Sequence, residues 1–291
     1  MEYILYSQAK LNLFLHLIGR NEKNYHLIQS VMHFTDLSDK IYIKKSDELK
    51  VKFVFNDDII FPQIDEKNNS MIRIIQTFCK KFDLNENFSI FVEKNIPSGG
   101  GLGGGSANGA TILKFLQKYY NLEISQKEQS ELALTIGCDA VACLHNEPIL
   151  VEGAGEIISK YSFDNKIYNS YVLLIYPQIF SSSEKAYTSF KENHYEFSEE
   201  IKFDNDIKID LKFLKKCRND LMQCAIKFFP QIGELLDFLN SKSDSEDCLV
   251  RMSGSGSSCF VLSENRNFLT QIEKELKVLN REYFSLICKF V

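Results

Sequence analysis

The chain has 291 residues, 44% of them hydrophobic and 25% charged, a composition typical of a globular enzyme with one large or two moderate domains. Its formal net charge of −5 argues against bulk attraction to nucleic acid or anionic membranes, so an anionic ligand must be bound by local donors. No stretch reaches the ~18 apolar residues that span a bilayer, and Glu2 stands where a secretory signal would be basic. We therefore expect a cytoplasmic protein with no membrane and no nucleic-acid partner.

The eight cysteines are scattered, without a C-x-x-C pair and without a histidine at zinc-site spacing. Such cysteines are typical of reduced thiols in a core. The five histidines form no H-E-x-x-H arrangement. The sequence therefore predicts no structural metal.

In chain order, the first part of the sequence predicts strands, a polar turn at residues 19–24 and one helix. Alternating or β-rich patterns place strands at residues 2–5, 11–17, 40–45, 49–55 and 88–93. Asn69 and its neighbours offer caps for a helix at residues 71–82, where apolar side chains recur on one face.

Helices and strands then follow in mixed order. Helices are expected at residues 106–120, 126–136, 208–217, 220–228 and 268–279, with Pro230 ending the fourth. Strands are expected at residues 149–152, 171–176, 249–252, 259–262 and 283–291. The polar residues 160–169 indicate a domain boundary, and the charged residues 191–206 indicate an exposed insertion. This order predicts an α+β fold rather than a regular βαβ array.

The strongest functional signal is a glycine run, since six of the seven residues from Gly99 to Gly105 are glycine. Such a run loses much conformational entropy on ordering, and packing alone rarely requires it. Glycines let backbone N–H groups close around an anion, and the helix that follows points its N-terminus at the charge. We interpret the run as a phosphate-binding loop. A flexible surface loop is the alternative, but the flanking strand and helix argue against it.

Other classes of phosphate loop fit less well. Walker A requires a lysine after its second glycine, and the run has none. Gly99, Gly101 and Gly104 satisfy G-x-G-x-x-G, but a dinucleotide-binding fold needs a second full strand before an acid such as Glu123, and residues 121–124 are too few for that strand. A protein kinase would carry H-R-D and D-F-G, and neither occurs.

The run instead resembles the P-x-x-x-G-L-G-[SG]-[SG]-S-A signature of the GHMP kinase superfamily. The other matching segments occur in the expected order and are Ala9-Lys10-Leu11-Asn12-Leu13, Tyr25-His26, Gly137-Cys138-Asp139, Glu152-Gly153-Ala154-Gly155-Glu156, Asn219-Asp220-Leu221 and Ser253-Gly254-Ser255-Gly256-Ser257. Two segments depart from the family pattern. Ala140-Val141 replaces the V-P after the aspartate, and Ser181-Ser182-Ser183 replaces V-S-T.

The resemblance implies a GHMP kinase-like two-domain α+β fold. Its N-terminal domain (residues 1–160) would be like domain 2 of ribosomal protein S5, and its C-terminal domain (residues 161–291) would be ferredoxin-like. It implies ATP as co-substrate, with Mg²⁺ expected. The expected substrate is a cytidine diphosphate-linked methylerythritol, phosphorylated on its 2-hydroxyl in the non-mevalonate route to isoprenoids. A monomer or homodimer is expected.

The resemblance also implies site residues. The ATP-binding positions would be Asn69, Lys94, Pro97, Ser98, Gly99, Gly100, Gly101, Leu102, Gly103, Gly104, Gly105, Ser106 and Ala107. The substrate-binding positions would be Asn12, Tyr25, His26, Ser182 and Ser183. The Ser253–Ser258 loop would lie beside the glycine run and support the phosphate site. Taken locally, the same loop would be a plain hairpin turn, Asn69 a helix cap and Lys94 a solvated charge at a strand end.

The catalytic pair implied by the resemblance is Lys10 and Asp139. A carboxylate can accept or orient the proton of the attacking hydroxyl, and an ammonium can stabilise developing negative charge. Taken locally, Lys10 would be a solvated edge charge and Asp139 a helix N-cap. Two alternatives stay open, namely a homoserine- or mevalonate-type kinase and an inert nucleotide-binding protein. Tyr25-His26 argues against the first, and the Lys10–Asp139 pair argues against the second.

Overall fold

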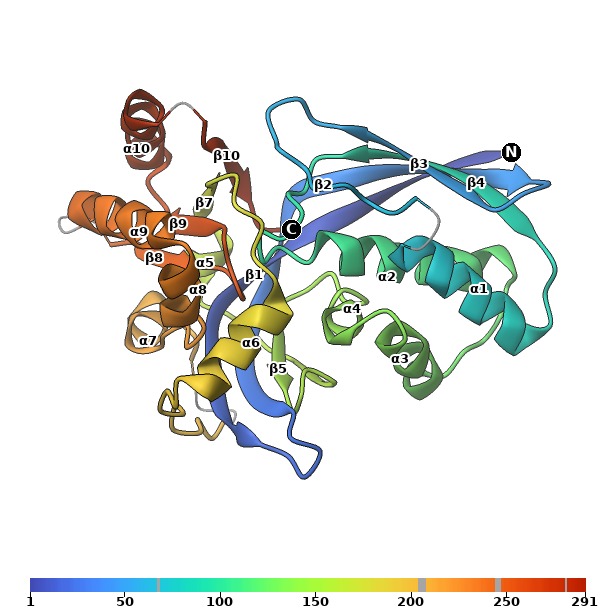
Figure 1. Ribbon diagram of the computed structural model, residues 1–291, viewed down its shortest axis with the longest axis horizontal. Helices are drawn as coiled ribbons and strands as arrows, with labels where there is room; N and C mark the ends of the chain where they lie inside the picture. The colour runs from blue at the N-terminus through green and yellow to red at the C-terminus, as the bar shows by residue number, and fades with distance from the viewer. Residues whose placement is uncertain (67–68, 204–207, 244–246, 281) are drawn as a thin grey trace. The chain divides into compact units, whose positions relative to one another are not determined.

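The computed structural model describes residues 1–66, 69–203, 208–243, 247–280 and 282–291 (Figure 1). By backbone proximity the chain forms two compact units that are interleaved in sequence. The first consists of Met1–Lys10, Leu37–Ser98 and Gly103–Asn146, and the second of Leu11–Asp36, Gly99–Leu102 and Glu147–Val291. These units do not follow one another along the chain, so the predicted division into residues 1–160 and 161–291 stays a prediction.

The strands and helices alternate in the irregular order expected of an α+β protein. The strands are β1 (Glu2–Arg20), β2 (His26–Ser46), β3 (Lys50–Phe55), β4 (Asn87–Lys94), β5 (Ile149–Glu152), β6 (Ile157–Lys160), β7 (Tyr171–Tyr176), β8 (Leu249–Met252), β9 (Cys259–Ser263) and β10 (Phe284–Lys289). The helices are α1 (Ser70–Phe82), α2 (Gly104–Tyr119), α3 (Gln126–Leu134), α4 (Cys138–Ala142), α5 (Asn165–Tyr168), α6 (Ser183–Glu192), α7 (Leu211–Lys216), α8 (Met222–Phe228), α9 (Pro230–Ser243) and α10 (Arg266–Leu279).

The first unit contains a sheet in which β4 lies between β2 and β3. β4 runs antiparallel to β2, with Lys40 opposite Glu93, and parallel to β3, with Lys50 opposite Ser89. A parallel pair needs a crossover connection, and α1 provides it between β3 and β4. β4 leads directly into residues 95–98, the segment of this unit that precedes the glycine run.

Helices α1 and α2 lie side by side in the first unit (Figure 1). α1 buries one apolar face, as its periodicity predicts, and begins at the expected cap: the Asn69 carboxamide oxygen accepts the N–H groups of Met71 and Ile72. Gly109 of α2 has no room for a side chain, because a Cβ there would lie 2.2 Å from the Ile136 side chain. α2 is therefore closely packed just beyond its first turn.

The second unit contains a separate antiparallel sheet of order β10-β7-β9-β8. Numbered along the chain, its strands stand in the order 4-1-3-2, with helices between the first and second and between the third and fourth. This is the β-α-β-β-α-β arrangement of a ferredoxin-like domain. Apolar residues of α9 and α10 pack with the sheet in one core. The expected α+β class is confirmed.

Two local expectations are corrected, and a third, an exposed stretch, agrees with the exposure of most of its described residues. Pro230 opens α9 rather than only ending the helix before it, because the first turn of a helix tolerates a residue without an N–H. Residues 6–10 and 26–39 are also strand, so β1 and β2 are longer than their alternating segments. Residues 28–35 of β2 are buried on both faces, and such a strand shows no period-two pattern. The expected insertion is mostly exposed where described, although it includes the end of α6 and a buried Ser198, and its residues 204–207 lie outside the described residues.

Within the described part of the chain, no helix combines the length and apolar character needed to cross a membrane.

His33 of β2 lies in an aromatic stack within the second unit. Its ring is parallel to that of Phe290, with centroids 4.1 Å apart, and stacks on Phe163 at 5.4 Å. Its Nδ1 accepts the N–H of Phe34, whereas its buried Nε2 has no hydrogen-bond partner among the described residues. Burial lowers the pKa of His33 to about 4.

We expect this histidine to make stability depend on pH. The unfolded chain binds the proton of His33 more tightly than the folded chain does. The contribution of neutral His33 to the free energy of unfolding is therefore complete when the pH is above about 6.5, the pKa in the unfolded chain, and it is lost as the pH falls toward 4. Between pH 7.5 and pH 5.0 the loss should be about 2 kcal/mol. Urea unfolding at the two pH values measures it, and His33→Phe should flatten the dependence by that amount. An equally steep dependence in His33→Phe would assign the effect to other groups.

Candidate active site

The glycine run adopts the backbone conformation that its composition predicts. Gly99, Gly101 and Gly103 have φ angles of +67°, +74° and +68°, in the left-handed region that other residues rarely adopt. At Gly101 the requirement is also steric, since a Cβ there would lie 2.1 Å from the Ser253 carbonyl oxygen. The run therefore needs glycine to adopt this conformation, a requirement that a flexible surface loop would not impose.

The N-terminus of α2 offers unpaired donors to an anion. Gly103 is the N-cap residue of this 16-residue helix and provides no side-chain acceptor for the first-turn N–H groups. The helix dipole also places partial positive charge there. A Cβ on Gly105 would meet nothing within 4 Å, so open space lies beside this turn. Backbone donors, positive potential and open space fit the phosphates of a nucleotide.

The remaining residues of the predicted ATP set have different surroundings. Pro97, Leu102 and Ala107 are buried, so their side chains anchor the run, whereas Ser98 and Ser106 are partly exposed. Their roles in ATP binding stay predictions.

Lys10 and Asp139 lie together in the first unit. Lys10 belongs to β1 and Asp139 to the first turn of α4, and Lys10 Nζ lies 3.4 Å from Asp139 Oδ2. The lysine side chain is only 3% exposed, whereas the aspartate is 46% exposed. The local interpretation of Lys10 as a solvated charge is therefore wrong. Asp139 is not the N-cap, because Gly137 holds that position.

This pair adjoins the start of α2. A Cβ built on Gly103 would lie 2.9 Å from Cγ and 3.1 Å from Cε of Lys10. The lysine stem thus packs against the N-cap residue of the helix whose N-terminus faces the open space. Because both features belong to the first unit, one compact body carries the ion pair and the helix terminus.

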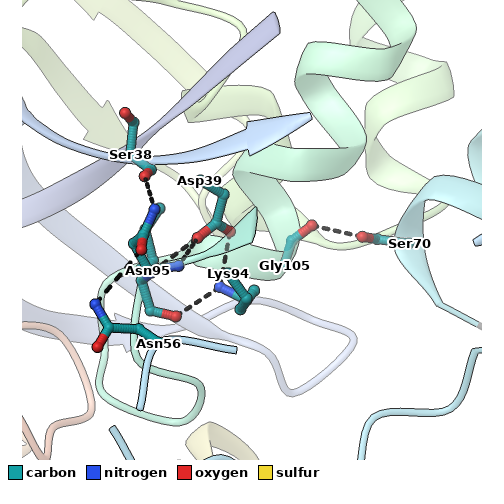
Figure 2. A network of polar contacts seen from close by, with 8 residues as sticks. Ser38, Asp39, Asn56, Ser70, Lys94, Asn95 and Gly105 are labelled. Carbon is teal, nitrogen blue, oxygen red and sulfur yellow. Dashed lines mark hydrogen bonds and ion pairs between the residues drawn. The ribbon is translucent and has the colours of Figure 1, made fainter. Parts of the chain in front are cut away.

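Lys94 is a second buried lysine near the same helix terminus, shown in Figure 2. It is 3% exposed, and its Nζ lies 2.7 Å from Asp39 Oδ2 and 2.5 Å from the Ile96 carbonyl oxygen. The other oxygen of Asp39 accepts the N–H groups of Asn95 and Ile96, both at 2.8 Å. Burial lowers the pKa of Lys94, and the Asp39 carboxylate opposes that change.

The local interpretation of Lys94 as a solvated charge is thus wrong. Its ammonium is a fixed part of the turn that enters the glycine run, and it lies 3.0 Å from where a Gly104 Cβ would be. Because residue 104 is a glycine, the first turn of α2 can lie in contact with the Lys94–Asp39 ion pair.

Asn69 caps α1, as its local interpretation predicts, and its Nδ2 also donates to the carbonyls of Asp65 and Glu66 at 3.3 and 3.2 Å. The next residue connects this cap to the glycine run, because Ser70 Oγ donates to the Gly105 carbonyl at 2.6 Å (Figure 2). An ATP contact by Asn69 stays a prediction.

The Ser253–Ser258 loop joins β8 to β9 and lies against the glycine run within the second unit. Ser258 N–H donates to the Gly100 carbonyl at 3.1 Å, and Ser253 Oγ donates to the Gly101 carbonyl at 3.1 Å. The two interpretations of this loop are therefore compatible, because it is both a hairpin connection and a support for the run.

Asn12 is fully buried beside this loop. Its N–H donates to Ser253 Oγ at 3.2 Å, and its Nδ2 donates to Ser30 Oγ at 2.8 Å. The predicted contact of Asn12 with substrate stays a prediction.

Tyr25 and His26 follow a turn in the second unit. Tyr25 is 63% exposed, whereas the half-buried ring of His26 lies within 6.4 Å of the rings of Tyr187, Phe190 and Phe197. Its Nε2 accepts from Arg20 Nε at 3.3 Å. Burial lowers the pKa of His26, and the charges of Arg20 and Lys191 lower it further. A neutral imidazole among aromatic rings can recognise a flat heterocycle.

Ser182 and Ser183 mark the start of α6. Ser182 is the N-cap residue, and Ser183 Oγ lies 2.8 Å from Ser255 Oγ. The preceding Ser181 donates from its N–H to the Gly99 carbonyl at 2.9 Å and from Oγ to the Ser255 carbonyl at 2.9 Å. This segment thus joins the two glycine-containing loops within the second unit.

Asp39 is a functional candidate that the sequence did not single out. A sequence pattern could have identified Asp39, because alternate residues of a strand point to the same face and Leu37, Ile41 and Ile43 face the core. The Asp39 carboxylate therefore also faces inward and needs a partner. Ser255 belongs to the predicted Ser253–Ser258 loop, but its contact with Ser183 depends on the tertiary fold.

Among the residues that the structure describes, no three His, Cys, Asp or Glu side chains gather as a metal site.

Comparisons with known proteins agree with this geometry. Residues 69–147 match the GHMP kinases N terminal domain. The chain is 34% identical over 262 residues to 4-diphosphocytidyl-2-C-methyl-D-erythritol kinase of Wolbachia pipientis wMel, covering 87% of this chain and 86% of that protein. It is 33% identical over 279 residues to the enzyme of that name from Persephonella marina, covering 94% and 95%. A crystal structure of 4-(cytidine 5'-diphospho)-2C-methyl-D-erythritol kinase has the same fold, with a TM-score of 0.75 at 22% identity over 99% of both chains. The sequence matches over nearly the whole length show that the chain belongs to the 4-diphosphocytidyl-2-C-methyl-D-erythritol kinase family.

Proposed function

We propose that this protein transfers the γ-phosphoryl group of ATP to the 2-hydroxyl of 4-diphosphocytidyl-2-C-methyl-D-erythritol, a step of the non-mevalonate route to isopentenyl diphosphate. The observation that carries the proposal is the 3.4 Å contact between buried Lys10 and half-exposed Asp139, beside the uncapped N-terminus of α2. Family membership supplies the substrate, since the relatives carry the name of this kinase.

The pair can perform both charge-handling tasks of the reaction. The substrate hydroxyl oxygen forms a bond to the γ-phosphorus, and the bond from that phosphorus to the bridging oxygen breaks, so the electron pair leaves with ADP. Asp139 is accessible enough to accept or orient the hydroxyl proton. Lys10 is held in place by burial, and its ammonium stabilises negative charge on the transferring group and on Asp139.

The phosphates would be held by the backbone donors of the glycine run and the first turn of α2, which includes Gly104, Gly105 and Ser106. Mg²⁺, expected with ATP, would supply positive charge that neutralises the phosphates. The partly exposed Ser106 hydroxyl and the Asp139 carboxylate are oxygen donors of the kind that Mg²⁺ accepts.

The cytosine ring would be recognised by Tyr25 and His26. The exposed tyrosine is free to stack on a base, and the imidazole is fixed by Arg20 and its aromatic neighbours. Asn12, Ser182 and Ser183 are proposed for the rest of this ligand. A monomeric or homodimeric state and a cytoplasmic location stay predictions.

A coupled assay of ADP release tests the proposal. The purified protein is supplied with ATP, Mg²⁺ and, in parallel, 4-diphosphocytidyl-2-C-methyl-D-erythritol, homoserine or mevalonate. We expect turnover with the cytidine substrate alone. Preferred turnover of homoserine or mevalonate would assign another kinase activity, and ATP binding without any turnover would identify an inert nucleotide-binding protein.

His26→Ala should raise KM for the cytidine substrate by about tenfold, the scale of one lost recognition contact, with a smaller effect on KM for ATP. His26 contacts Arg20 and aromatic rings of the second unit, so its loss should be selective for the ring that it recognises. His194→Ala is the matched control, because His194 is an exposed histidine of the same unit. Equal effects on both KM values would contradict a role in cytosine recognition.

A further inference from the structure

The Asn219-Asp220-Leu221 segment has no role in the reaction proposed above. It lies between α7 and α8, and its backbone is fixed to β1 within the second unit. The Leu15 N–H donates to the Arg218 carbonyl at 3.1 Å, and the Asp220 N–H donates to the Leu15 carbonyl at 2.9 Å. The side chain of Asn219 therefore extends from a fixed backbone.

The Asn219 carboxamide is buried and makes three hydrogen bonds. Its Nδ2 donates to the carbonyls of Met252 and Gly254, both at 2.8 Å, and its Oδ1 accepts the Leu221 N–H at 3.0 Å. Only one orientation of the amide satisfies these three groups, because the flipped amide would point its oxygen at the two carbonyls and its NH₂ at the Leu221 N–H. The residue is 4% exposed, so either carbonyl would lose a partner in a dry environment if the amide were removed.

The two carbonyls belong to the residues on either side of Ser253, which contacts the glycine run. Ser253 Oγ donates to the Gly101 carbonyl at 3.1 Å, and a Cβ on Gly101 would lie 2.1 Å from the Ser253 carbonyl oxygen. The approach is thus so close that a small shift of Ser253 must move Gly101. Ser258 holds the neighbouring Gly100 from the other end of the same loop.

We infer that Asn219 is a positioning residue for the nucleotide phosphates. It fixes the Ser253–Ser258 loop and, through that loop, the backbone of Gly100 and Gly101, without touching the ligand itself. The inference rests on the proposed binding of ATP phosphates by the glycine run. The contacts lead from β1 to Asn219, from Asn219 to the backbone around Ser253, and from Ser253 to the glycine run. Each of them is a hydrogen bond or close contact inside the second unit.

Asp220 offers a matched control in the same segment. Its carboxylate accepts from the Leu17 N–H at 2.7 Å, from Ser198 Oγ and from Arg218 Nε at 2.5 Å. These partners do not belong to the Ser253–Ser258 loop, and Asp220→Asn keeps both backbone hydrogen bonds to Leu15 that fix the position of Asn219. Asp220→Asn should therefore lower the melting temperature while leaving KM for ATP unchanged.

Asn219→Asp keeps the size of the side chain but turns a donor of two hydrogen bonds into an acceptor facing two carbonyls. We expect KM for ATP to rise by about tenfold or more, the scale of a small misplacement of binding groups. KM for the cytidine substrate should change less. Steady-state kinetics gives both values, and calorimetry gives the dissociation constant of ATP without turnover.

Asn219→Ala and Ser253→Ala test the same inference if Asn219→Asp does not fold. Each should weaken ATP binding, and the double variant should lose less than the product of the two single losses, because both act on Gly101. Normal ATP affinity in folded Asn219 variants, or an effect equal to that of Asp220→Asn, would overturn the inference. A wild-type protein that binds ATP but phosphorylates no alcohol would refute the proposed function. In that case the ATP dissociation constants of the Asn219 variants, measured by calorimetry, would still test this inference.

Discussion

Replacing Asp139 by Asn should lower kcat by about two to four orders of magnitude, the usual scale for losing acid–base assistance. The amide preserves the shape of the side chain but has neither the charge nor the basicity of the carboxylate. Lys10 also loses its 3.4 Å ion-pair partner, so the charge balance around the reacting hydroxyl changes. ADP release at saturating substrates measures the effect, and ATP affinity should change much less than kcat.

Glu128→Gln is the matched control for this substitution. Glu128 is also an acid in the first turn of a helix of the first unit, and it lies 3.4 Å from Lys81 Nζ. The control therefore removes a helix-terminal carboxylate and an ion pair of the same length without touching the candidate site. It should leave kcat unchanged. A folded Asp139→Asn enzyme with near-normal turnover would remove Asp139 from the mechanism.

Lys10→Ala should also lower kcat, because the ammonium stabilises the transferring group. If Lys10 and Asp139 act as one unit, the double variant should lose less than the product of the two single losses. Independent, multiplying losses would mean that the two residues contribute to separate steps.

Gly103→Val should weaken ATP binding by about two orders of magnitude, since a displaced first turn no longer aims its N–H groups at the phosphates. The φ of Gly103 is +68°, which a branched residue avoids, and the added Cβ would lie 2.9 Å from Cγ of Lys10. Because the new side chain also pushes on Lys10, kcat should fall together with affinity. Calorimetry with ATP and steady-state kinetics separate the two effects.

Gly153→Val controls for the backbone strain. Gly153 has a nearly identical φ of +69°, and its nearest neighbour is the flexible Glu156 side chain. This variant should lose stability without weakening ATP binding. Unchanged ATP affinity in Gly103→Val, or equal weakening in both variants, would contradict the assignment of the phosphate loop.

Side-chain periodicity in the sequence determined many of the elements. α1 begins at Asn69 and buries one face, as its caps and apolar spacing predict. The glycine run was recognisable because only glycine adopts left-handed φ angles at little cost. These features are local: each depends on residues within one or two turns of the chain, so the sequence alone suffices to predict them.

The tertiary structure decided which charges are buried and what they contact. Locally, Lys10 resembles a solvated edge charge and Lys94 a solvated charge at a strand end, yet both are 3% exposed. A buried ammonium is tolerated only where a carboxylate or carbonyl compensates for lost hydration, and the partners, Asp139 and Asp39, lie far away in sequence. The contact of Ser253 with Gly101 depends likewise on folding of the second unit. Because pairings of this kind arise from long-range packing, no local pattern in the chain specifies them.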